Sequence, residues 1–351
     1  MSFPTSADGW ALGDACDAQQ TCAIGVARTT DGGSTWAMVT SVGHPNPNGA
    51  ELSLTAASSE DAWVWGTDSD GQPVFVATHD GGATWQPVNA GAAVVDISVA
   101  SGTAWALTAC PQAGGTCAIA LLSAPVGGGP WTDLPSLPTS VQGAPVSNAL
   151  ARGPELVRSG LTAWVLNDNQ SPPALVSTDD GGQTWSSLPL PCATFGSLFL
   201  GASSAKDLML VCADDGTSSP AAQEVWTSGD GGATWVIQSR DNETSFSPPL
   251  PDLGSLNNGG DPYGLMVVSD TSAWMINHNE DDLVSHDNGV TWANVPLPAN
   301  LTSAWQGGAE VDITFADALH GWIFSKSGLW VTTDGGTVWT AQPIIGVVPG
   351  A

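Results

Sequence analysis

Four carboxylates in this sequence could carry out acid–base chemistry: Glu51, Asp96, Glu310 and Asp312. Each lies close to the start of a short apolar run that is predicted to be a strand. Two carboxylates roughly 5 to 10 Å apart across a sugar are enough to hydrolyse a glycosidic bond. These four residues are therefore the candidate catalytic groups of a glycosidase.

Aromatic and basic side chains on long connecting segments add to this chemistry. Trp305 and Tyr263 could stack against sugar rings, and His278 lies on a neighbouring polar segment. Tyr263 acting with His278 or Arg240 would instead suit a polysaccharide lyase. We therefore treat Trp305, Tyr263 and His278 as candidate ligand-binding residues, and Tyr263 and Arg240 also as candidate catalytic residues.

Two acidic segments, residues 68–71 and 277–282, could bind Ca²⁺ through carboxylate oxygens. Neither has the twelve-residue spacing of an EF-hand. The competing interpretation, which we favour, is a solvated acidic rim that keeps a lysine-poor protein soluble. Calcium is the one cofactor that the sequence suggests, and its candidate ligands are Asp68, Asp70, Glu280, Asp281 and Asp282.

The charge balance narrows the choice of partner. The chain has 351 residues, with 34 Asp and Glu against 6 Lys and Arg, and a net charge of −28. A chain with so few cations cannot neutralise phosphates or attach electrostatically to an anionic bilayer. Nucleic acids and membrane surfaces are therefore excluded as partners. The 17 Trp residues argue against disorder.

The elements that position these residues come from an internal repeat. An octapeptide of the form Ser/Thr-x-Asp-x-Gly-x-Thr-Trp occurs six times, with Val338 replacing Thr in the last copy. A short apolar run, usually centred on Trp, precedes each copy and occurs seven times. The extra run, at Trp105, is followed by a degenerate octapeptide that ends at Trp131 and has lost its Asp. The octapeptides span residues 29–36, 78–85, 178–185, 228–235, 285–292 and 332–339.

Seven repeats of roughly 50 residues follow from these two markers. Within each repeat, four short runs rich in β-branched and aromatic residues alternate with Gly, Pro, Asn and Asp, and no helical period appears. In the third repeat the predicted strands are 96–100, 104–108, 117–122 and 131–134. This pattern predicts an all-β, seven-bladed β-propeller in one domain over residues 1–351. The blades span approximately 1–43, 44–90, 91–138, 139–190, 191–240, 241–298 and 299–351.

The octapeptide resembles the Asp-box, also called the bacterial neuraminidase repeat. In that family the box forms the turn between the third and fourth strands of a blade, which implies a structural role for its aspartate. Such a carboxylate can accept N–H groups within its own turn, and repetition around a scaffold argues against catalysis. The residues concerned are Asp31, Asp80, Asp180, Asp230, Asp287 and Asp334.

Sialidases carry the same box, but their active-site pattern fits this chain poorly. It needs three Arg, a Tyr nucleophile with its Glu, and an Asp acid/base. Only four Arg and one Tyr are present, and Arg28 lies in a third strand, away from the predicted channel. Sialidase activity is therefore improbable.

Xyloglucan hydrolases are similar in their seven-bladed units but build a cleft between two propellers. The photosystem II assembly-factor propellers are similar in length and blade number, but they present a basic patch that this chain lacks.

The first blade begins late in its repeat. Residues 2–10 align with residues 314–322, so most of the first strand of blade 1 is missing from its usual place in the sequence. The tail 344–348 follows the last strand, where every other repeat enters the next blade. We predict that this tail completes blade 1. The alternative is that further sequence precedes residue 1.

Six cysteines occupy related positions in the repeats. Cys16 and Cys22 flank the connection between the second and third strands of blade 1, and Cys110 and Cys117 flank the same connection in blade 3. Cys192 precedes the first strand of blade 5, and Cys212 ends its second strand. We predict disulfides 16–22, 110–117 and 192–212. Zinc is the rival interpretation, but thiolate sites usually contain Cys-x₂-Cys pairs. Three disulfides imply an oxidising compartment and hence secretion, although no signal peptide is present.

These observations predict a secreted, monomeric propeller that acts by binding. The connections between second and third strands, together with the starts of first strands, concentrate acids on one face. We expect that face to bind a protein, a glycan or a cation. The alternative is a carbohydrate-active enzyme, either a glycoside hydrolase or a polysaccharide lyase, that uses carboxylates at the mouth of the central channel.

Overall fold

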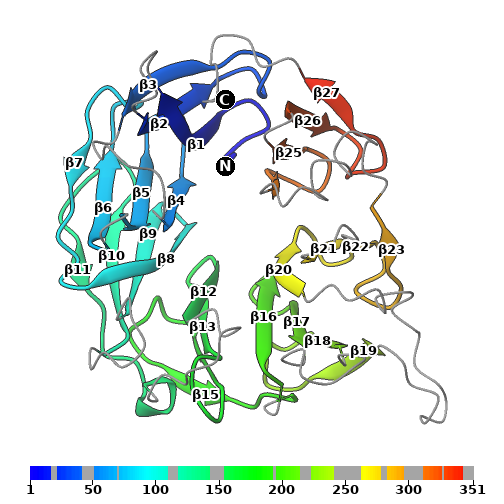
Figure 1. Cartoon of the computed structure of the whole chain (residues 1–351). Helices are drawn as coiled ribbons and strands as arrows, with labels where there is room; N and C mark the ends of the chain where they lie inside the picture. The colour runs from blue at the N-terminus through cyan, green and yellow to red at the C-terminus, as the bar shows by residue number, and fades with distance from the viewer. Residues whose placement is uncertain are drawn as a thin grey trace. The chain divides into compact units, whose positions relative to one another are not determined.

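The computed structural model describes residues 1–16, 22–41, 51–68, 71–109, 118–142, 154–192, 195–213, 223–240, 262–277, 283–295, 311–325 and 328–342. These residues form 27 strands in seven separate antiparallel sheets (Figure 1). The one helical element in these ranges is a short 3₁₀ turn, η1 (Thr139–Val141). Seven such sheets are the blades of a seven-bladed β-propeller, which confirms the predicted fold class. The described part of the chain contains no helix long and apolar enough to cross a membrane.

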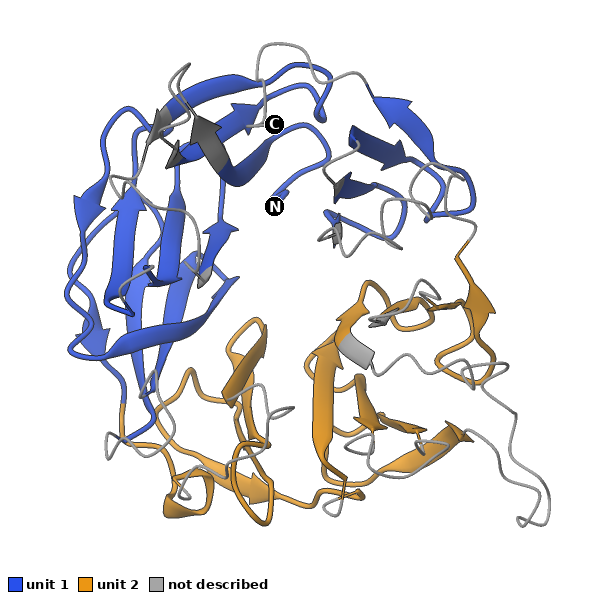
Figure 2. Cartoon of the chain, viewed as in Figure 1, with its two compact units in different colours: residues 1–134, 296–351 blue, residues 135–295 orange. Residues whose placement is uncertain are grey.

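The chain divides into two compact units, shown in separate colours in Figure 2. The first unit consists of residues 1–134 and 296–351 and holds blades 1, 2, 3 and 7. Their strands are β1 (Gly9–Cys16), β2 (Cys22–Thr29) and β3 (Ala37–Ser41); β4 (Glu51–Ala56), β5 (Ala62–Thr67), β6 (Pro73–Thr78) and β7 (Gln86–Pro87); β8 (Ala93–Ala100), β9 (Thr103–Ala109), β10 (Ala120–Pro125) and β11 (Thr132–Asp133); and β24 (Val311–Phe315), β25 (Gly321–Ser325), β26 (Gly328–Thr332) and β27 (Thr340–Gln342).

The second unit consists of residues 135–295 and holds blades 4, 5 and 6. Its strands are β12 (Pro154–Ser159), β13 (Thr162–Asn167), β14 (Ala174–Thr178) and β15 (Ser186–Leu188); β16 (Ser197–Ala202), β17 (Leu208–Ala213), β18 (Gln223–Ser228) and β19 (Val236–Arg240); and β20 (Pro262–Val267), β21 (Ala273–Asn277), β22 (Leu283–Ser285) and β23 (Ala293–Asn294). The prediction of one domain over residues 1–351 stays a prediction.

Every sheet is a meander in which strands adjacent in sequence pair side by side. The six octapeptides begin at the end of the third strand of a blade and lead into the fourth, as predicted. Blade 3 departs from its predicted strands. Its third strand is Ala120–Pro125 rather than 117–122, and its first strand begins earlier, at Ala93, with a register irregularity between Val94 and Asp96.

In five of the seven blades the core contains a fully buried tryptophan of the second strand, where β1 counts as the second strand of blade 1. Trp10, Trp63, Trp164, Trp274 and Trp322 occupy equivalent positions there, and each indole is almost completely buried. A glycine or alanine precedes each of them, as in Ala62-Trp63. Burial of such aromatic side chains is the main source of stability in a chain with few charge pairs.

Among the described residues, blade 1 has three strands where each of the other six blades has four, and its β1 and β2 are equivalent to the second and third strands of those blades. Ser2 pairs with Trp10 through two backbone hydrogen bonds of 3.0 and 2.9 Å, the same pairing that Thr314 makes with Trp322 in blade 7. The predicted alignment of the two segments is therefore confirmed. Residues 344–348, which we predict to complete blade 1, lie outside the described residues.

One of the three predicted disulfides lies in the described residues. Cys192 and Cys212 are joined, as predicted, and both side chains are buried. Cys16 and Cys22 lie opposite each other in the β1–β2 register, but their side chains are not described. Cys110 and Cys117 lie outside the described residues.

Candidate functional site

The predicted catalytic carboxylates lie on first strands, where the sequence placed them. Glu51 begins β4 and pairs with Thr67, and Asp312 in β24 pairs with Phe324. Their side chains are not among those described. Asp96 lies in β8 at the register irregularity and is half-buried. Glu310 lies outside the described residues, so the proximity of any two of these carboxylates stays a prediction.

The predicted ligand-binding residues fall mainly outside the described ranges. Tyr263 lies in β20, at another register irregularity, and only its backbone is described. Trp305 and His278 lie in segments that the structure does not describe. Their grouping around a ligand therefore also stays a prediction.

Asp68 serves the local fold. Its side chain accepts the backbone N–H of Gln72 at 2.8 Å, and its backbone N–H and carbonyl bond to Gln72 and Gly71. The residue is buried and closes the tight turn between β5 and β6. Asp70, Glu280, Asp281 and Asp282 lie outside the described residues, within which no group of three or more His, Cys, Asp or Glu side chains could hold a metal ion.

Five of the six octapeptide turns hold their aspartate in the same way. In blade 4, Asp180 accepts the N–H of Thr184 at 2.9 Å and the hydroxyls of Thr178 and Thr184 at 2.7 and 2.6 Å. The Thr178 hydroxyl in turn accepts the N–H of Gly182 at 3.0 Å. The φ angles of Gly181 and Gly182 are positive, which explains the glycines at these positions. The carboxylate is thus the centre of a closed hydrogen-bond network.

These networks favour the ionised form of the aspartates. Hydrogen bonds from the Thr184 hydroxyl and N–H lower the pKa of Asp180 to about 2. Equivalent bonds lower the pKa of Asp80 and Asp230. For Asp31 and Asp287, burial acts in the raising direction, but the hydrogen bonds outweigh it and the pKa is lowered. A general acid would need a raised pKa, so these six residues have the electrostatics of structural anions.

The last turn lacks one of these bonds. Val338 stands where the other turns have Thr, so Asp334 receives the Val338 N–H at 2.9 Å but no hydroxyl from that residue. The backbone bond from Val338 is the largest contribution that lowers the pKa of Asp334. The Val338 side chain is 59% exposed.

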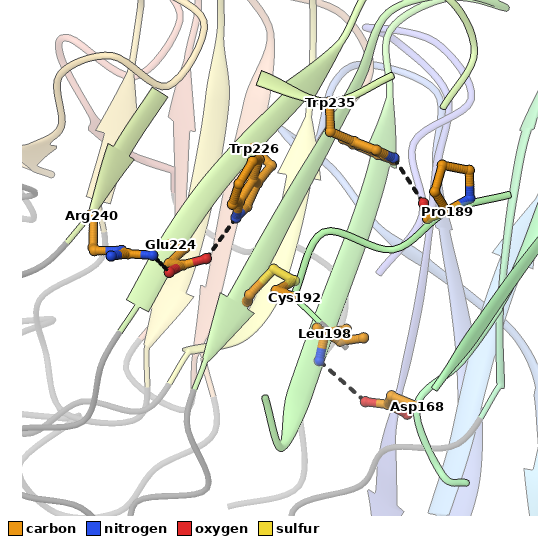
Figure 3. Close-up of a disulfide and its surroundings, with 9 residues drawn as sticks. Asp168, Pro189, Cys192, Leu198, Glu224, Trp226, Trp235 and Arg240 are labelled. Atoms are coloured by element: carbon orange, nitrogen blue, oxygen red, sulfur yellow. Dashed lines mark hydrogen bonds and ion pairs between the residues drawn. A yellow bond between two sulfur atoms is a disulfide. The ribbon is translucent and has the colours of Figure 1, made fainter. Parts of the chain in front are cut away.

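Arg240 forms an ion pair with a neighbouring acid. Its guanidinium donates to Glu224 on the adjacent strand, and the other carboxylate oxygen of Glu224 accepts the indole N–H of Trp226 at 2.8 Å (Figure 3). Glu224 is buried. A buried carboxylate must be paired, and Arg240 supplies the pair.

Two further acids join blades 4 and 5. Asp168 accepts the N–H of Leu198 at 3.3 Å, and Glu155 accepts the N–H of Leu200 at 3.2 Å. Both N–H groups belong to β16, so acids from blade 4 bond the first strand of blade 5 (Figure 3 shows the Asp168 bond). On the same strand as Glu155, burial lowers the pKa of Arg158 to about 10.

The sequence interpretation missed a cluster between blades 2 and 3. One oxygen of Asp61 accepts the N–H of Gly127 at 2.9 Å and lies 2.8 Å from Nδ1 of His79, and the other accepts the Ser58 hydroxyl at 2.7 Å. Gly127 belongs to the degenerate turn, in which Val126 stands at the position of the aspartate. A carboxylate from the preceding blade therefore bonds this turn. Two features of the sequence could have indicated this contact: the absence of Asp from the turn, and the Ser-x-x-Asp pattern at 58–61.

Comparison with known proteins supports the architecture. A family model described as "DUF6242 beta propeller domain" matches residues 32–343. No curated protein matches the sequence. Among solved structures, "YCF48 bound to D1 peptide" has a TM-score of 0.59 and 16% identity, covering 95% of this chain and 91% of that one.

Two other structures extend this comparison. YCF48 from Cyanidioschyzon merolae has a TM-score of 0.53 and 16% identity, covering 87% of this chain and 88% of that one. A GH74 enzyme from Niastella koreensis has a TM-score of 0.40 and 12% identity, covering 97% of this chain and 68% of that one. At these identities the two YCF48 structures show a shared fold. The TM-score of the GH74 enzyme is too low to carry an argument.

Proposed function

Because the chain belongs to the family described as DUF6242 beta propeller domain, we propose that it is a binding protein that presents an acidic face to a protein, glycan or cation. The observation that carries this proposal is that many polar side chains predicted as site residues bond to the fold. Asp68, Arg240 and the six turn aspartates all belong to the predicted site residues, and each is held by bonds to the fold. Residues committed in this way build a rigid scaffold.

The charge of the whole chain favours a cationic or neutral ligand. A net charge of −28 gives a negative potential that attracts cations and cationic protein segments and repels anions. YCF48, which shares the fold, has been solved with a bound peptide. That likeness supports the use of such a scaffold for binding and leaves the identity of the ligand to experiment.

We also propose that the protein works in an oxidising compartment. The Cys192–Cys212 disulfide supports this, because such bonds persist mainly outside the reducing cytosol. Mass spectrometry of the purified protein with and without reductant should show a mass difference of about 2 Da for each disulfide. A thiol at both positions in protein taken directly from its source would contradict the proposal.

The test of function is a paired screen on the whole protein. Glycan and peptide arrays measure binding, and a panel of polysaccharides measures hydrolysis and elimination, each with and without Ca²⁺. We expect binding without turnover. Turnover that Glu51→Ala or Asp312→Ala abolishes would overturn the proposal in favour of the enzyme. Asp179→Ala serves as the control, because Asp179 is an exposed turn residue away from the first strands.

A further inference from the structure

The octapeptide turn of blade 6 differs from the other five at one position. Asn288 stands where the others have glycine, namely Gly32, Gly81, Gly181, Gly231 and Gly335. Its φ angle is 61°, in the left-handed region that asparagine tolerates better than most residues. The backbone N–H of Asn288 donates to the carbonyl of Thr271 at 3.0 Å. The turn therefore keeps its shape and gains an Asn-Gly pair.

This pair combines an exposed amide with an unhindered nucleophile. Asn288 is exposed, and its side chain makes no hydrogen bond within the described residues. Gly289 follows and has no side chain to obstruct attack by its backbone nitrogen. In the other five turns the residue before the equivalent glycine is itself a glycine and has no side chain to attack. The aspartate one position earlier is bonded and ionised, which makes its carboxylate a poor target for a nucleophile.

We propose that Asn288 is a site of spontaneous deamidation. The backbone nitrogen of Gly289 bonds to Cγ of Asn288, the Cγ–Nδ2 bond breaks, and ammonia leaves with the proton that Gly289 nitrogen loses. Water then opens the resulting cyclic imide at either carbonyl. One product is aspartate, and the other is isoaspartate, in which the main chain runs through the former side chain.

The fold restrains this reaction. The nitrogen that must attack is buried, and it donates its proton to the Ser285 hydroxyl at 2.9 Å. The Gly289 carbonyl accepts the Ser239 hydroxyl at 2.7 Å and the Trp292 indole N–H at 3.1 Å. Gly289 must leave these partners before it can reach the Asn288 side chain. Local opening of the turn therefore sets the rate.

The two products have different consequences for the second unit. Aspartate at 288 adds a negative charge but leaves the main chain intact. Isoaspartate adds one carbon to the main chain before Gly289, which lies so close to Val225 that a Cβ there would come within 2.8 Å of it. The added atom would displace Gly289 from Ser239 and Val225 of blade 5. Modification at an exposed turn would thus loosen the junction between blades 5 and 6.

Peptide mapping by mass spectrometry tests the proposal. The wild-type protein is aged at mildly alkaline pH in its native state and in denaturant, and the mass gain of about 1 Da at Asn288 is followed in time. The digest must separate this site from the Asn-Gly pairs at 48–49 and 258–259. We expect slow modification of the native protein and fast modification in denaturant. Equal rates, or no modification of Asn288 in denaturant, would overturn the proposal.

Ser285→Ala removes the bond that holds the Gly289 nitrogen. We expect modification in the native variant to be roughly threefold to tenfold faster than in wild type, as the loss of one hydrogen bond predicts. Ser228→Ala removes the equivalent bond to Gly232 in blade 5 and is the matched control for general loss of stability. Equal acceleration by both substitutions would contradict local control by Ser285.

Discussion

Single hydrogen bonds distinguish the repeated turns from one another. In blade 6 the hydroxyl of Thr291 donates to Asp287 at 2.6 Å, whereas Val338 in blade 7 offers Asp334 only its backbone. Both residues occupy the same position in an exposed turn. The two turns therefore form a natural pair for measuring what one hydroxyl contributes.

Val338→Thr should stabilise the protein. The new hydroxyl can donate to the free oxygen position on Asp334, and an exposed apolar side chain is removed from the surface. We expect a rise in Tm of roughly 1–3 °C in thermal unfolding. Thr291→Val is the reverse substitution and should lower Tm by a similar amount. An unchanged Tm for both variants would show that the hydroxyl contributes nothing.

The turn aspartates should make stability depend on acid pH. The pKa of Asp180 is lowered from 3.8 to about 2 in the folded protein, so its stabilising effect is fully present above about pH 4 and is lost as the pH falls towards 2. Asp180→Asn should therefore lower Tm at neutral pH. The difference in Tm between this variant and wild type should shrink as the pH falls through this range.

Asp179→Asn is the control for this pH series. It removes an adjacent exposed carboxylate for which the described residues supply no hydrogen-bond donor. Its difference from wild type should remain small throughout. A gap between Asp180→Asn and wild type that stays constant from pH 7 to about pH 2 would contradict the assigned role.

At the scale of elements, the second-strand tryptophans connect neighbouring blades. The indole N–H of Trp322 donates to the Gly32 carbonyl at 2.8 Å, and that of Trp164 donates to the Gly231 carbonyl at 2.9 Å. Trp63 packs instead against the degenerate turn, and its indole N–H has no acceptor among the described residues. The degenerate turn of blade 3 thus removes a hydrogen-bond acceptor from the tryptophan of blade 2.

Trp322→Phe should destabilise the protein more than Trp63→Phe. Both substitutions remove the same atoms from a buried site, but only the first breaks a hydrogen bond. We expect the free energies of unfolding, measured with denaturant, to differ by about 1 kcal/mol. Equal losses would mean that the indole–carbonyl bond adds nothing to the packing.

The disulfide should stabilise blade 5. It joins the segment before β16 to the end of β17 across 20 residues of sequence. Replacing both cysteines by alanine should lower the free energy of unfolding by about 3 kcal/mol, the loop-closure value for this length. Denaturant unfolding of oxidised wild type against Cys192→Ala/Cys212→Ala measures the effect. Because the predicted disulfides 16–22 and 110–117 remain in the variant, a reductant should lower the free energy of unfolding of the variant less than that of wild type.

Element-level features differed in how well the sequence predicted them. The octapeptide determined its own turn, because all of the necessary donors lie within eight residues. The Cys192–Cys212 bond followed from the repeat alignment. The link from Asp61 to Gly127 could not be predicted in this way, because it depends on how a substituted turn packs against the preceding blade. The pairing of Arg240 with Glu224 could not be predicted for a similar reason, because the burial of Glu224 depends on how the strands of blade 5 pack.

For the whole molecule, the charge of −28 has two distinct origins. Six of the acids hold the octapeptide turns, and others, such as Glu155 and Glu224, bond strands or basic groups within the second unit. The sequence predicted the first group from its repetition. The bonds made by the second group could not be predicted, because burial cannot be read from residue type alone. The catalytic candidates on the first strands await a direct test.

Deleting residues 344–351 tests how blade 1 is completed. Along β1, the structure describes only the Ser2–Trp10 pairing on the edge opposite β2. If the tail supplies the missing strand, the deletion should lower Tm by more than about 5 °C. A shorter deletion of residues 349–351, which leaves the apolar run intact, is the control. If the protein lacking residues 344–351 has the same Tm as the full-length protein, the tail has no such role.

The paired tryptophans also make the first unit optically informative. Trp10 and Trp85 lie edge to face with centroids 6.2 Å apart, and Trp63 and Trp131 do so at 6.3 Å. Indoles at such a distance and angle couple their electronic transitions and give an exciton couplet in far-ultraviolet circular dichroism. Each couplet reports one junction between blades. Unfolding of the first unit can therefore be followed junction by junction, without a label, by removing one indole at a time.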